Sequence, residues 1–257
     1  MSLTLTASGV TVRFARRDTP VLDDLSLTVA AGSCTVLVGP SGCGKSTLLD
    51  CFAGLRRPDS GVVTENGVPI TGPAPRRGVV FQRDVLFPWS SVRANLDFVL
   101  GAAGMPRRAR PARIAELLAA VHLPADVATR RPHELSGGMR QRVGVARMLA
   151  GDPEVMLMDE PFAALDAQTR LHMQDLVTEL WANSGRTVLF VTHDVDEAIR
   201  LADHFVILGA GTIRARFDNP LPRPRPADRL AELPGYSALR RRLHAELWVE
   251  ADDLLSH

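Results

Sequence analysis

The sequence predicts an α/β fold built around a mostly parallel sheet. A short β-favouring run occurs at 35–38, and wholly apolar runs, which are typical of strands covered on both faces, occur at 155–158 and 188–191. Helical patterns separate these runs, as parallel strands require, because each crossover must return the chain to the same end of the sheet. The first run also leads directly into a glycine-rich segment followed by a helical pattern at 45–52.

Composition excludes several classes of protein. The chain has 257 residues, a length that suits one large domain, and its 30 basic and 29 acidic residues give no strong field for binding nucleic acid or anionic lipid. The apolar runs are far shorter than the roughly 20 residues that span a bilayer. The N-terminus shows no secretory pattern, and the three cysteines form no CxxC pair. We therefore expect a cytoplasmic protein.

The remaining elements follow from hydrophobic periodicity. Residues 10–14 and 25–29 alternate as half-buried strands do, with Phe14 on the face of Val10 and Val12. Between about 90 and 150 the pattern is helical, and a further helical stretch covers 168–183. The helical spacing is carried by Ile114, Leu117, Leu118 and Val121.

The end of the chain differs in composition. Residues 219–226 are rich in proline and arginine and are expected to form a linker. An amphipathic helix follows, with Tyr236, Leu239, Leu243 and Leu247 on one stripe. We expect a main domain over 1–218, containing a helical subdomain at about 90–150, and a linker with a terminal helix over 219–257.

Residues 39–46, GPSGCGKS, match the phosphate-binding pattern GxxxxGK[ST] between a predicted strand and a predicted helix. The glycines allow backbone N–H groups to surround an anion at the helix N-terminus. Lys45, the sole lysine among 30 basic residues, can reach the β- and γ-phosphates of ATP, and the Ser46 hydroxyl can ligate Mg²⁺. The alternative is a glycine-rich turn with a surface lysine. The predicted nucleotide contacts here are Gly39, Pro40, Ser41, Gly42, Cys43, Gly44, Lys45, Ser46 and Thr47.

Polar residues follow three of the apolar runs, at the strand ends where parallel α/β sheets hold ligands. Asp159 and Glu160 follow 155–158, His193 lies just after 188–191, and Gln82 follows 79–81. An acidic pair after a buried strand needs compensation, which Mg²⁺ would supply to Asp159. The adjacent Glu160 could orient or deprotonate an attacking water. A solvated acidic pair is the alternative.

One further motif narrows the class of protein that carries this phosphate-binding loop. Residues 135–142, LSGGMRQR, resemble the signature motif of ABC-type ATPases. Gln82 resembles the Q-loop glutamine of that family, residues 164–166 its D-loop, and His193 its switch histidine. The resemblance covers about residues 3–215. It implies a P-loop NTPase core with a mostly parallel sheet, an N-terminal antiparallel β subdomain and a helical insert.

The resemblance also implies roles for individual residues. Ser136 is a good N-cap. Together with Gly137 and Gly138 it would touch the γ-phosphate of the ATP bound to a second copy of the chain. Two copies would thus form a homodimer with two ATP molecules between them. His193 would contact the γ-phosphate and position Glu160. The metal ligands would be Ser46, Gln82 and Asp159, and Asp166 would lie near the nucleotide. Phe14 would stack on adenine, although core packing with Val10 and Val12 is an open alternative.

The kind of ABC protein is indicated by the segment around Gln82. Residues 86–89, LFPW, form an apolar patch suited to a groove that receives a short helix of a membrane permease. Together with 72–82, this region is similar to the ATPase subunits of nitrate, aliphatic sulfonate and taurine importers, although Ala163 stands where glycine is usual. The resemblance implies a peripheral subunit on the cytoplasmic face of the inner membrane, served indirectly by a substrate-binding protein.

Other functions remain open at this point. A non-transport ABC ATPase of DNA repair or translation, a transporter motor for a different substrate, and a GTP-dependent switch are the rivals. The chain has no second lysine with which to make the NKxD motif of guanine-specific proteins. The arginines at 107, 108, 110 and 113 could suggest nucleic-acid binding, but a solvated helical face with no nucleic-acid partner is the expectation.

Overall fold

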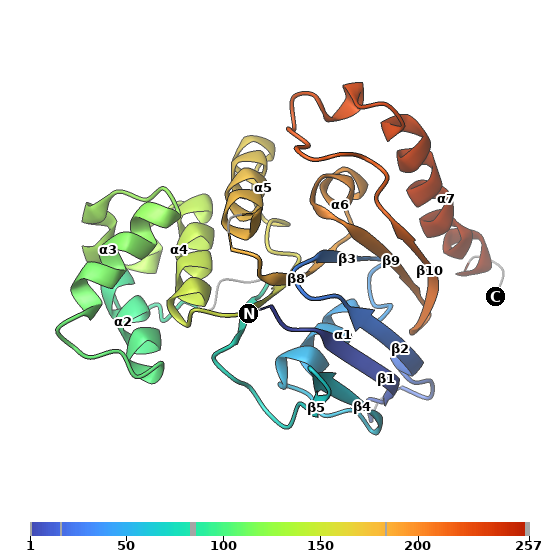
Figure 1. Ribbon diagram of the computed structural model, residues 1–257, viewed down its shortest axis with the longest axis horizontal. Coiled ribbons are helices and arrows are strands. Elements are labelled where there is room, and N and C mark those ends of the chain that lie inside the picture. The colour runs from blue at the N-terminus through green and yellow to red at the C-terminus, as the bar shows by residue number, and fades with distance from the viewer. Residues whose placement is uncertain (1, 16, 83–85, 183, 255–257) are drawn as a thin grey trace. The chain divides into compact units, whose positions relative to one another are not determined.

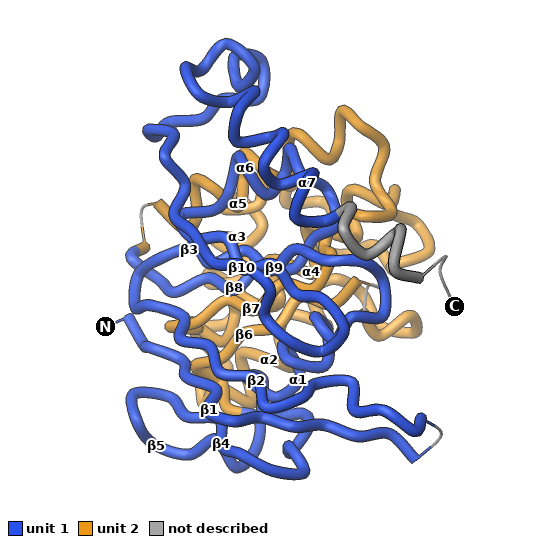
Figure 2. The backbone as a smooth tube through the Cα atoms, turned by 90° about the vertical axis from the view of Figure 1, so that its right-hand side faces the viewer, with its two compact units in different colours: residues 1–73, 185–257 blue, residues 74–184 orange. Residues whose placement is uncertain are grey.

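A computed structural model describes residues 2–15, 17–82, 86–182 and 184–254. The chain divides into two compact units, which are described separately (Figure 2). Unit 1 comprises residues 1–73 and 185–257, and unit 2 comprises residues 74–184. Figure 1 labels the helices and strands used below.

Unit 1 contains a four-stranded antiparallel sheet in the order β2-β1-β4-β5. Its strands are β1 (Leu5–Val12), β2 (Leu22–Val29), β4 (Ser60–Glu65) and β5 (Val68–Pro69). Buried and exposed residues alternate along β2 from Leu25 to Val29, as the sequence predicts. Gly61 has a positive φ of 78°, and a Cβ there would lie 2.2 Å from the carbonyl oxygen of Gly9, so β1 and β4 approach too closely for any side chain.

The second sheet of unit 1 has β3 between two parallel neighbours, β8 and β9, and β10 antiparallel to β9. These strands are β3 (Cys34–Val38), β8 (Thr187–Thr192), β9 (His204–Gly209) and β10 (Thr212–Asp218). Every residue of β3 and β8 is buried, which confirms that continuous apolar runs form strands covered on both faces.

Three helices among the described residues of unit 1 pack against these sheets, and a short 3₁₀ helix contacts the last of the three. They are α1 (Lys45–Ala53), α6 (Val195–Leu201), α7 (Tyr236–Leu254) and the short 3₁₀ helix η3 (Leu230–Glu232). α1 buries Leu48, Leu49 and Phe52 completely. Each such side chain stabilises the fold by about 1.5–3 kcal/mol relative to exposure, which fixes α1 firmly at the end of β3.

Unit 2 contains the parallel pair β6 (Arg77–Val80) and β7 (Val155–Asp159), with Arg77 opposite Val155. Its helices are α2 (Val92–Ala102), α3 (Arg110–Ala120), α4 (Gly137–Ala150) and α5 (Ala167–Ala182), with 3₁₀ turns η1 (Ala125–Thr129) and η2 (Pro132–Glu134). α2, α3 and α4 pack on one another, and the predicted stripe of α3 is buried. The helical prediction for 90–150 is therefore confirmed.

The C-terminal part of unit 1 folds back onto the sheet that contains β3. In Figure 1, α7 lies beside α6 and β10, and contacts with α6 and β9 agree with that view. Leu239 and Leu243 of α7 are buried, which confirms the predicted amphipathic stripe at these positions. None of the helices in the described part of the chain has the length and apolar character needed to cross a bilayer.

Candidate functional site

The glycine-rich loop after β3 has the backbone that the sequence predicts. Gly42 and Gly44 have φ values of 82° and 106°, in the region that favours glycine. A Cβ at Gly39 would lie 2.4 Å from the carbonyl oxygen of Leu208, and one at Gly44 would lie 2.7 Å from that of Val21. These positions therefore admit no side chain, and the loop is held close to β9 and to the start of β2.

α1 begins at Lys45 with no side-chain cap and no acidic residue in its first turn. Its first N–H groups and the positive end of its dipole consequently suit an anion. Lys45 is 5% exposed, and its Nζ donates hydrogen bonds to the carbonyl oxygens of Gly39 at 2.6 Å and Pro40 at 2.9 Å. Ser41, Gly42 and Ser46 are exposed and Thr47 is half-buried, whereas Cys43 is buried.

Strand register in unit 1 brings the predicted switch histidine to the same sheet end as the glycine-rich loop. Val38 of β3 pairs with Thr192 of parallel β8. The next residues, Gly39 and His193, therefore leave the sheet side by side. His193 is exposed, and the residues flanking it are tied together because the Thr192 hydroxyl accepts a 3.0 Å hydrogen bond from the N–H of Asp194.

The same relationship occurs independently in unit 2. Val80 of β6 pairs with Met158 of parallel β7, so Gln82 and Glu160, each two residues further on, follow neighbouring strand ends. Gln82 is exposed, and Asp159 and Glu160 are half-buried. An amide and two carboxylates thus lie at one edge of this strand pair. Residues 83–85, which follow Gln82, lie outside the described residues.

Glu160 has a left-handed backbone, with φ of 41°, which is uncommon for a residue other than glycine. Such a conformation costs of order 1–3 kcal/mol and is held by its surroundings. Beyond it, Asp166 accepts a 2.9 Å hydrogen bond from the N–H of Thr169 at the start of α5. This backbone hydrogen bond lowers the pKa of Asp166. Arg170 secures the intervening turn by donating to the carbonyl oxygens of Phe162 and Leu165.

The signature segment forms a capped helix start. Ser136 is the N-cap of α4, and its hydroxyl accepts a 3.3 Å hydrogen bond from the N–H of Met139. Ser136 and Gly137 are exposed. A Cβ at Gly138 would lie 2.5 Å from Cγ2 of Thr169, so the glycine lets α4 approach the start of α5. The N-cap prediction is confirmed, and the helix presents its N-terminal end to solvent.

Phe14 departs from the face on which alternation places it. β1 ends at Val12, which is 1% exposed, whereas Phe14 is 36% exposed. The Arg56 guanidinium lies 4.2 Å from the Phe14 ring centroid, a cation–π geometry. Core packing with Val10 and Val12 is therefore excluded. Phe14 is instead an accessible aromatic surface in unit 1.

An apolar groove in unit 2, which the sequence indicated only through residues 86–89, has a volume of about 330 Å³. Its walls come from β6, α2 and α4, and include Val80, Leu86, Val99, Ala102, Arg147 and Met148. Three aromatic rings are linked to it through the wall residue Arg147. Phe87 stacks on Trp89 at 5.7 Å and meets Phe98 edge-on at 5.1 Å, while Arg147 covers Phe87 at 4.5 Å.

Residues outside 86–89 were missed as part of this surface because α2 and α4 lie far apart in sequence. Trp89 and Phe98 are 73% and 58% exposed. Helical periodicity identifies buried stripes and gives no signal for an apolar side chain left in solvent. Together, the groove and its three aromatic rings form what we call the aromatic groove.

Comparisons with known proteins agree with these local geometries. Residues 22–163 match the family described as ABC transporter. The taurine import ATP-binding protein of Chromobacterium violaceum is 44% identical over 252 residues, covering 96% of each chain. That of Pseudomonas entomophila is 48% identical over 199 residues, covering 77% of this chain and 76% of its own.

Solved structures resemble the fold as well. A dimeric bacterial ABC transporter cassette has a TM-score of 0.76 and 28% identity, covering 84% of this chain and 98% of its own. A dimeric cassette in a post-hydrolysis state, bound to ADP and Pi, has a TM-score of 0.75 with the same identity and coverage. The chain belongs to the ABC transporter family, and it is an ABC ATPase. The expected fold class is thereby confirmed, and the non-transport alternatives are not favoured.

Proposed function

We propose that this chain is the ATP-hydrolysing subunit of an importer for taurine or a similar small sulfonate. Two copies would bind Mg²⁺-ATP between them at the cytoplasmic face of the inner membrane and drive a permease. The observation that carries this proposal is the strand register, Val38 with Thr192 and Val80 with Met158. In unit 1 it brings the glycine-rich loop beside the strand end that carries His193, and in unit 2 it brings Gln82 and Glu160 to adjacent strand ends. The similarity over 96% of a taurine import protein supports the transport role.

The phosphate-binding part of the proposal rests on unit 1. The glycine-rich loop and the uncapped start of α1 would offer N–H donors to an anion, and buried Lys45 would add a compact positive charge. Phe14 offers an accessible ring for the adenine base. His193, which leaves the sheet beside Gly39, would touch the γ-phosphate.

The metal-binding part uses oxygen donors. Ser46, Gln82 and Asp159 provide a hydroxyl, an amide and a carboxylate, the hard ligands that Mg²⁺ prefers along with phosphate oxygens. The chemistry of these donor groups therefore suits this ion. When bound, Mg²⁺ would neutralise charge on the phosphates.

Glu160 is the proposed general base for the attacking water. Glu160 directly follows the last residue of β7, and its backbone, with φ of 41°, leaves the extended conformation at this point. The carboxylate would orient the water and accept its proton, while His193 holds the γ-phosphate in line. A strained backbone at this residue is consistent with a position fixed by function.

Dimerisation would complete the site. Ser136, Gly137 and Gly138 form an exposed helix start that would face the γ-phosphate bound by the partner subunit. Asp166 would lie near the nucleotide, with one carboxylate oxygen already engaged at the start of α5. ATP would then act as part of the interface.

The aromatic groove is the proposed permease contact. The cavity is apolar and about 330 Å³ in volume, and its wall residue Arg147 covers Phe87. Trp89 and Phe98, which contact the Phe87 ring, remain largely exposed. These features suit the apolar face of a short helix from the membrane subunit. The substrate itself would be bound by the permease and a separate binding protein, so its identity is inferred from the relatives.

Reconstitution tests the proposal as a whole. The chain is combined with the permease and binding protein encoded beside it, in lipid vesicles, and ATP-dependent uptake of radiolabelled taurine is measured. We expect ATP-dependent uptake of taurine. Unlabelled sulfonates should compete with it strongly and nitrate only poorly, and Glu160→Gln should abolish it. ATP hydrolysis without uptake of taurine would reject taurine as the substrate. Failure of the purified chain to hydrolyse ATP would reject the proposal that it is an ATPase.

A further inference from the structure

The C-terminal segment after β10 holds α6 at both ends. α6 has seven residues, Val195–Leu201, and begins two positions after His193. A helix this short forms few internal hydrogen bonds, so its position depends on what surrounds it. Residues 219–254 supply much of that surrounding structure.

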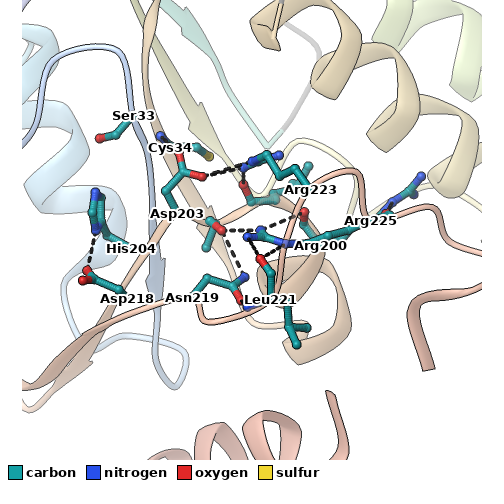
Figure 3. Close-up of polar contacts among 12 residues, drawn as sticks. Ser33, Cys34, Arg200, Asp203, His204, Asp218, Asn219, Leu221, Arg223 and Arg225 are labelled. Atoms are coloured by element: carbon teal, nitrogen blue, oxygen red, sulfur yellow. Dashed lines mark hydrogen bonds and ion pairs between the residues drawn. The ribbon is translucent and has the colours of Figure 1, made fainter. Parts of the chain in front are cut away.

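At the C-terminal end of α6, Arg225 is 7% exposed and acts as a many-fold donor (Figure 3). Its guanidinium donates to the carbonyl oxygens of Ile199, Arg200, Ala202 and Leu221. Asn219 Nδ2 donates to two of the same oxygens, those of Ile199 at 2.8 Å and Ala202 at 3.0 Å. The last carbonyl groups of α6, which a helix leaves without internal partners, are thus satisfied by residues of the C-terminal segment.

Arg223 adds an ion pair to this end. Its Nε and Nη2 donate to the Asp203 carboxylate at 3.1 and 3.0 Å (Figure 3). The other carboxylate oxygen of Asp203 accepts a 2.9 Å hydrogen bond from the N–H of Cys34 at the start of β3. The C-terminal segment is therefore joined to the central strand of the sheet as well as to α6.

At the N-terminal end of α6, two side chains of α7 meet on one acceptor. The Tyr236 hydroxyl donates to Oδ1 of Asp196 at 2.6 Å, and Nε of Arg240 donates to the same oxygen at 2.9 Å. Asp196 lies in the first turn of α6, and Tyr236 is the sole tyrosine of the chain. α7 is fixed in turn by the buried side chains of Leu239 and Leu243.

This first turn is continuous with the turn that carries His193. The side chain of Asp194 caps α6 by accepting a 2.9 Å hydrogen bond from the N–H of Glu197. The N–H of Asp194 donates to the Thr192 hydroxyl at 3.0 Å. His193 therefore lies between the end of β8 and a helix turn whose orientation α7 restrains.

The contact on Asp196 is poorly suited to stabilising the fold. The side chains of Arg240 and Asp196 are 47% and 48% exposed, and such ion pairs contribute little in water. Their geometry is specific, however, because a hydroxyl and a guanidinium converge on one carboxylate oxygen. Such a contact is better suited to orienting a helix turn than to holding the domain together.

We propose that Tyr236 and Arg240 are positioning residues for ATP hydrolysis. Acting through Asp196, they set the orientation of the α6 first turn and hence of His193. The C-terminal helix is then part of the hydrolytic machinery, although it touches no reacting atom. This inference rests on the role of His193 in the proposed function.

Steady-state ATP hydrolysis by the full-length chain tests the inference. In the double variant Tyr236→Phe, Arg240→Met, we expect kcat to fall about fivefold with KM and calorimetric ATP affinity unchanged, because displacement of a group that acts on the reacting centre affects rate more than binding. The neighbouring exposed residue gives the control, and Arg241→Met should hydrolyse ATP at the wild-type rate. A wild-type kcat in the double variant would overturn the proposal. A lower Tm accompanied by unchanged kcat per folded molecule would also overturn it, by showing a purely structural role.

A double-mutant cycle tests whether the effect passes through Asp196. If Tyr236→Phe and Asp196→Asn interrupt one contact, the combined loss of kcat should equal the larger single loss rather than the product of the two. Independent, multiplying losses would contradict this route. Rescue of kcat by Arg240→Lys in place of Arg240→Met would support the charge-assisted contact, since lysine keeps the charge.

His193→Ala separates failure of this inference from failure of the proposed function. If His193→Ala loses hydrolysis while the α7 double variant keeps it, only the positioning inference is wrong. If His193→Ala hydrolyses ATP normally, the role of His193 is wrong and the inference falls with it. Loss of hydrolysis in His193→Ala and a reduced kcat in the α7 double variant, with ATP affinity unchanged in both, is the result that supports the proposal.

Discussion

Lys45 Nζ lies 2.6 Å from the carbonyl oxygen of Gly39, so the lysine holds closed the loop that precedes its own helix. A second hydrogen bond, of 2.9 Å, joins Nζ to the carbonyl oxygen of Pro40. An ammonium group has three donors, which leaves one for a phosphate oxygen while the loop keeps its shape. Loop geometry and phosphate affinity are therefore coupled through one atom.

Replacing Lys45 should therefore weaken nucleotide binding. We expect Lys45→Ala to lower ATP affinity by roughly 10- to 100-fold, as befits loss of a charge-assisted hydrogen bond. Lys45→Arg should not restore it, because a planar guanidinium is too broad for this nearly buried position. Isothermal titration calorimetry measures the effect, with Arg57→Ala on an exposed neighbour as the control. Wild-type affinity in Lys45→Ala would refute the phosphate site.

Glu160→Gln should separate binding from hydrolysis. Loss of a general base lowers turnover by about 10²- to 10⁴-fold, whereas a glutamine leaves the shape of the site unchanged. We expect normal ATP affinity, almost no phosphate release and accumulation of an ATP-bound dimer. Glu179→Gln, at a largely exposed carboxylate of the same unit, provides the matched control. Phosphate release at the wild-type rate by Glu160→Gln would exclude this residue as the base.

Ser136→Arg should act on association and leave nucleotide binding by the single chain intact. The exposed N-cap of α4 has no room for a long cation if a partner's phosphate must approach it. In the Glu160→Gln background, we expect size-exclusion chromatography with ATP to show monomers in place of dimers. Ser237→Arg, an exposed change on α7, should dimerise normally. Dimers of unchanged stability in Ser136→Arg would count against the shared site.

Trp89→Ala should uncouple hydrolysis from transport. Trp89 is 73% exposed and stacks only on Phe87 among the ring contacts described, so its loss should leave ATP hydrolysis by the isolated subunit unchanged. In vesicles with the permease, we expect reduced binding to the membrane subunit and reduced uptake. Val68→Ala, which removes a similarly exposed apolar side chain from β5, is the control. Equal uptake by Trp89→Ala and the wild-type chain would remove the aromatic groove from the permease contact.

Two buried thiols predict a loss of stability at alkaline pH. Burial raises the pKa of Cys34 to about 12, with a further contribution from Asp203, and burial raises that of Cys51 to about 11. The unfolded chain can ionise these thiols near pH 9, whereas the folded chain keeps them protonated to higher pH. Their contribution to the free energy of unfolding is therefore complete below pH 9 and is lost as pH rises from 9 to 12. Urea unfolding at pH 8 to 11 should show a decreasing free energy of unfolding. Cys34→Ala should make the decrease shallower, and an unchanged slope would contradict the assignment.

Much of the fold follows from local pattern. The nearly continuous apolar runs identify β3, β7 and β8, because a strand that is buried on both faces has few polar side chains. The GxxxxGK[ST] pattern identifies the loop, because close backbone approaches require its glycines. The Ser136 cap follows from side-chain chemistry alone. These features depend on residues within a few positions of one another.

Other features depend on partners distant in sequence. In the sequence, Phe14 continues the alternation of Val10 and Val12. Because β1 ends at Val12, the alternation does not predict the direction of the Phe14 side chain. The proline- and arginine-rich composition after β10 suggests a linker. Composition does not reveal that Arg225 donates hydrogen bonds to carbonyl groups at the end of α6. The roles assigned to Glu160, His193 and the signature residues remain predictions, since each depends on ATP and a second subunit.

The anchoring of Arg225 has a practical consequence for defining the enzymatic part of this chain. Composition suggests a boundary at residue 218, yet truncation there would leave the final carbonyl groups of α6 to water and remove both donors from Asp196. Deleting the tail would then alter the enzyme itself. Loss of function in such a deletion should therefore not be interpreted as loss of a separate regulatory appendage.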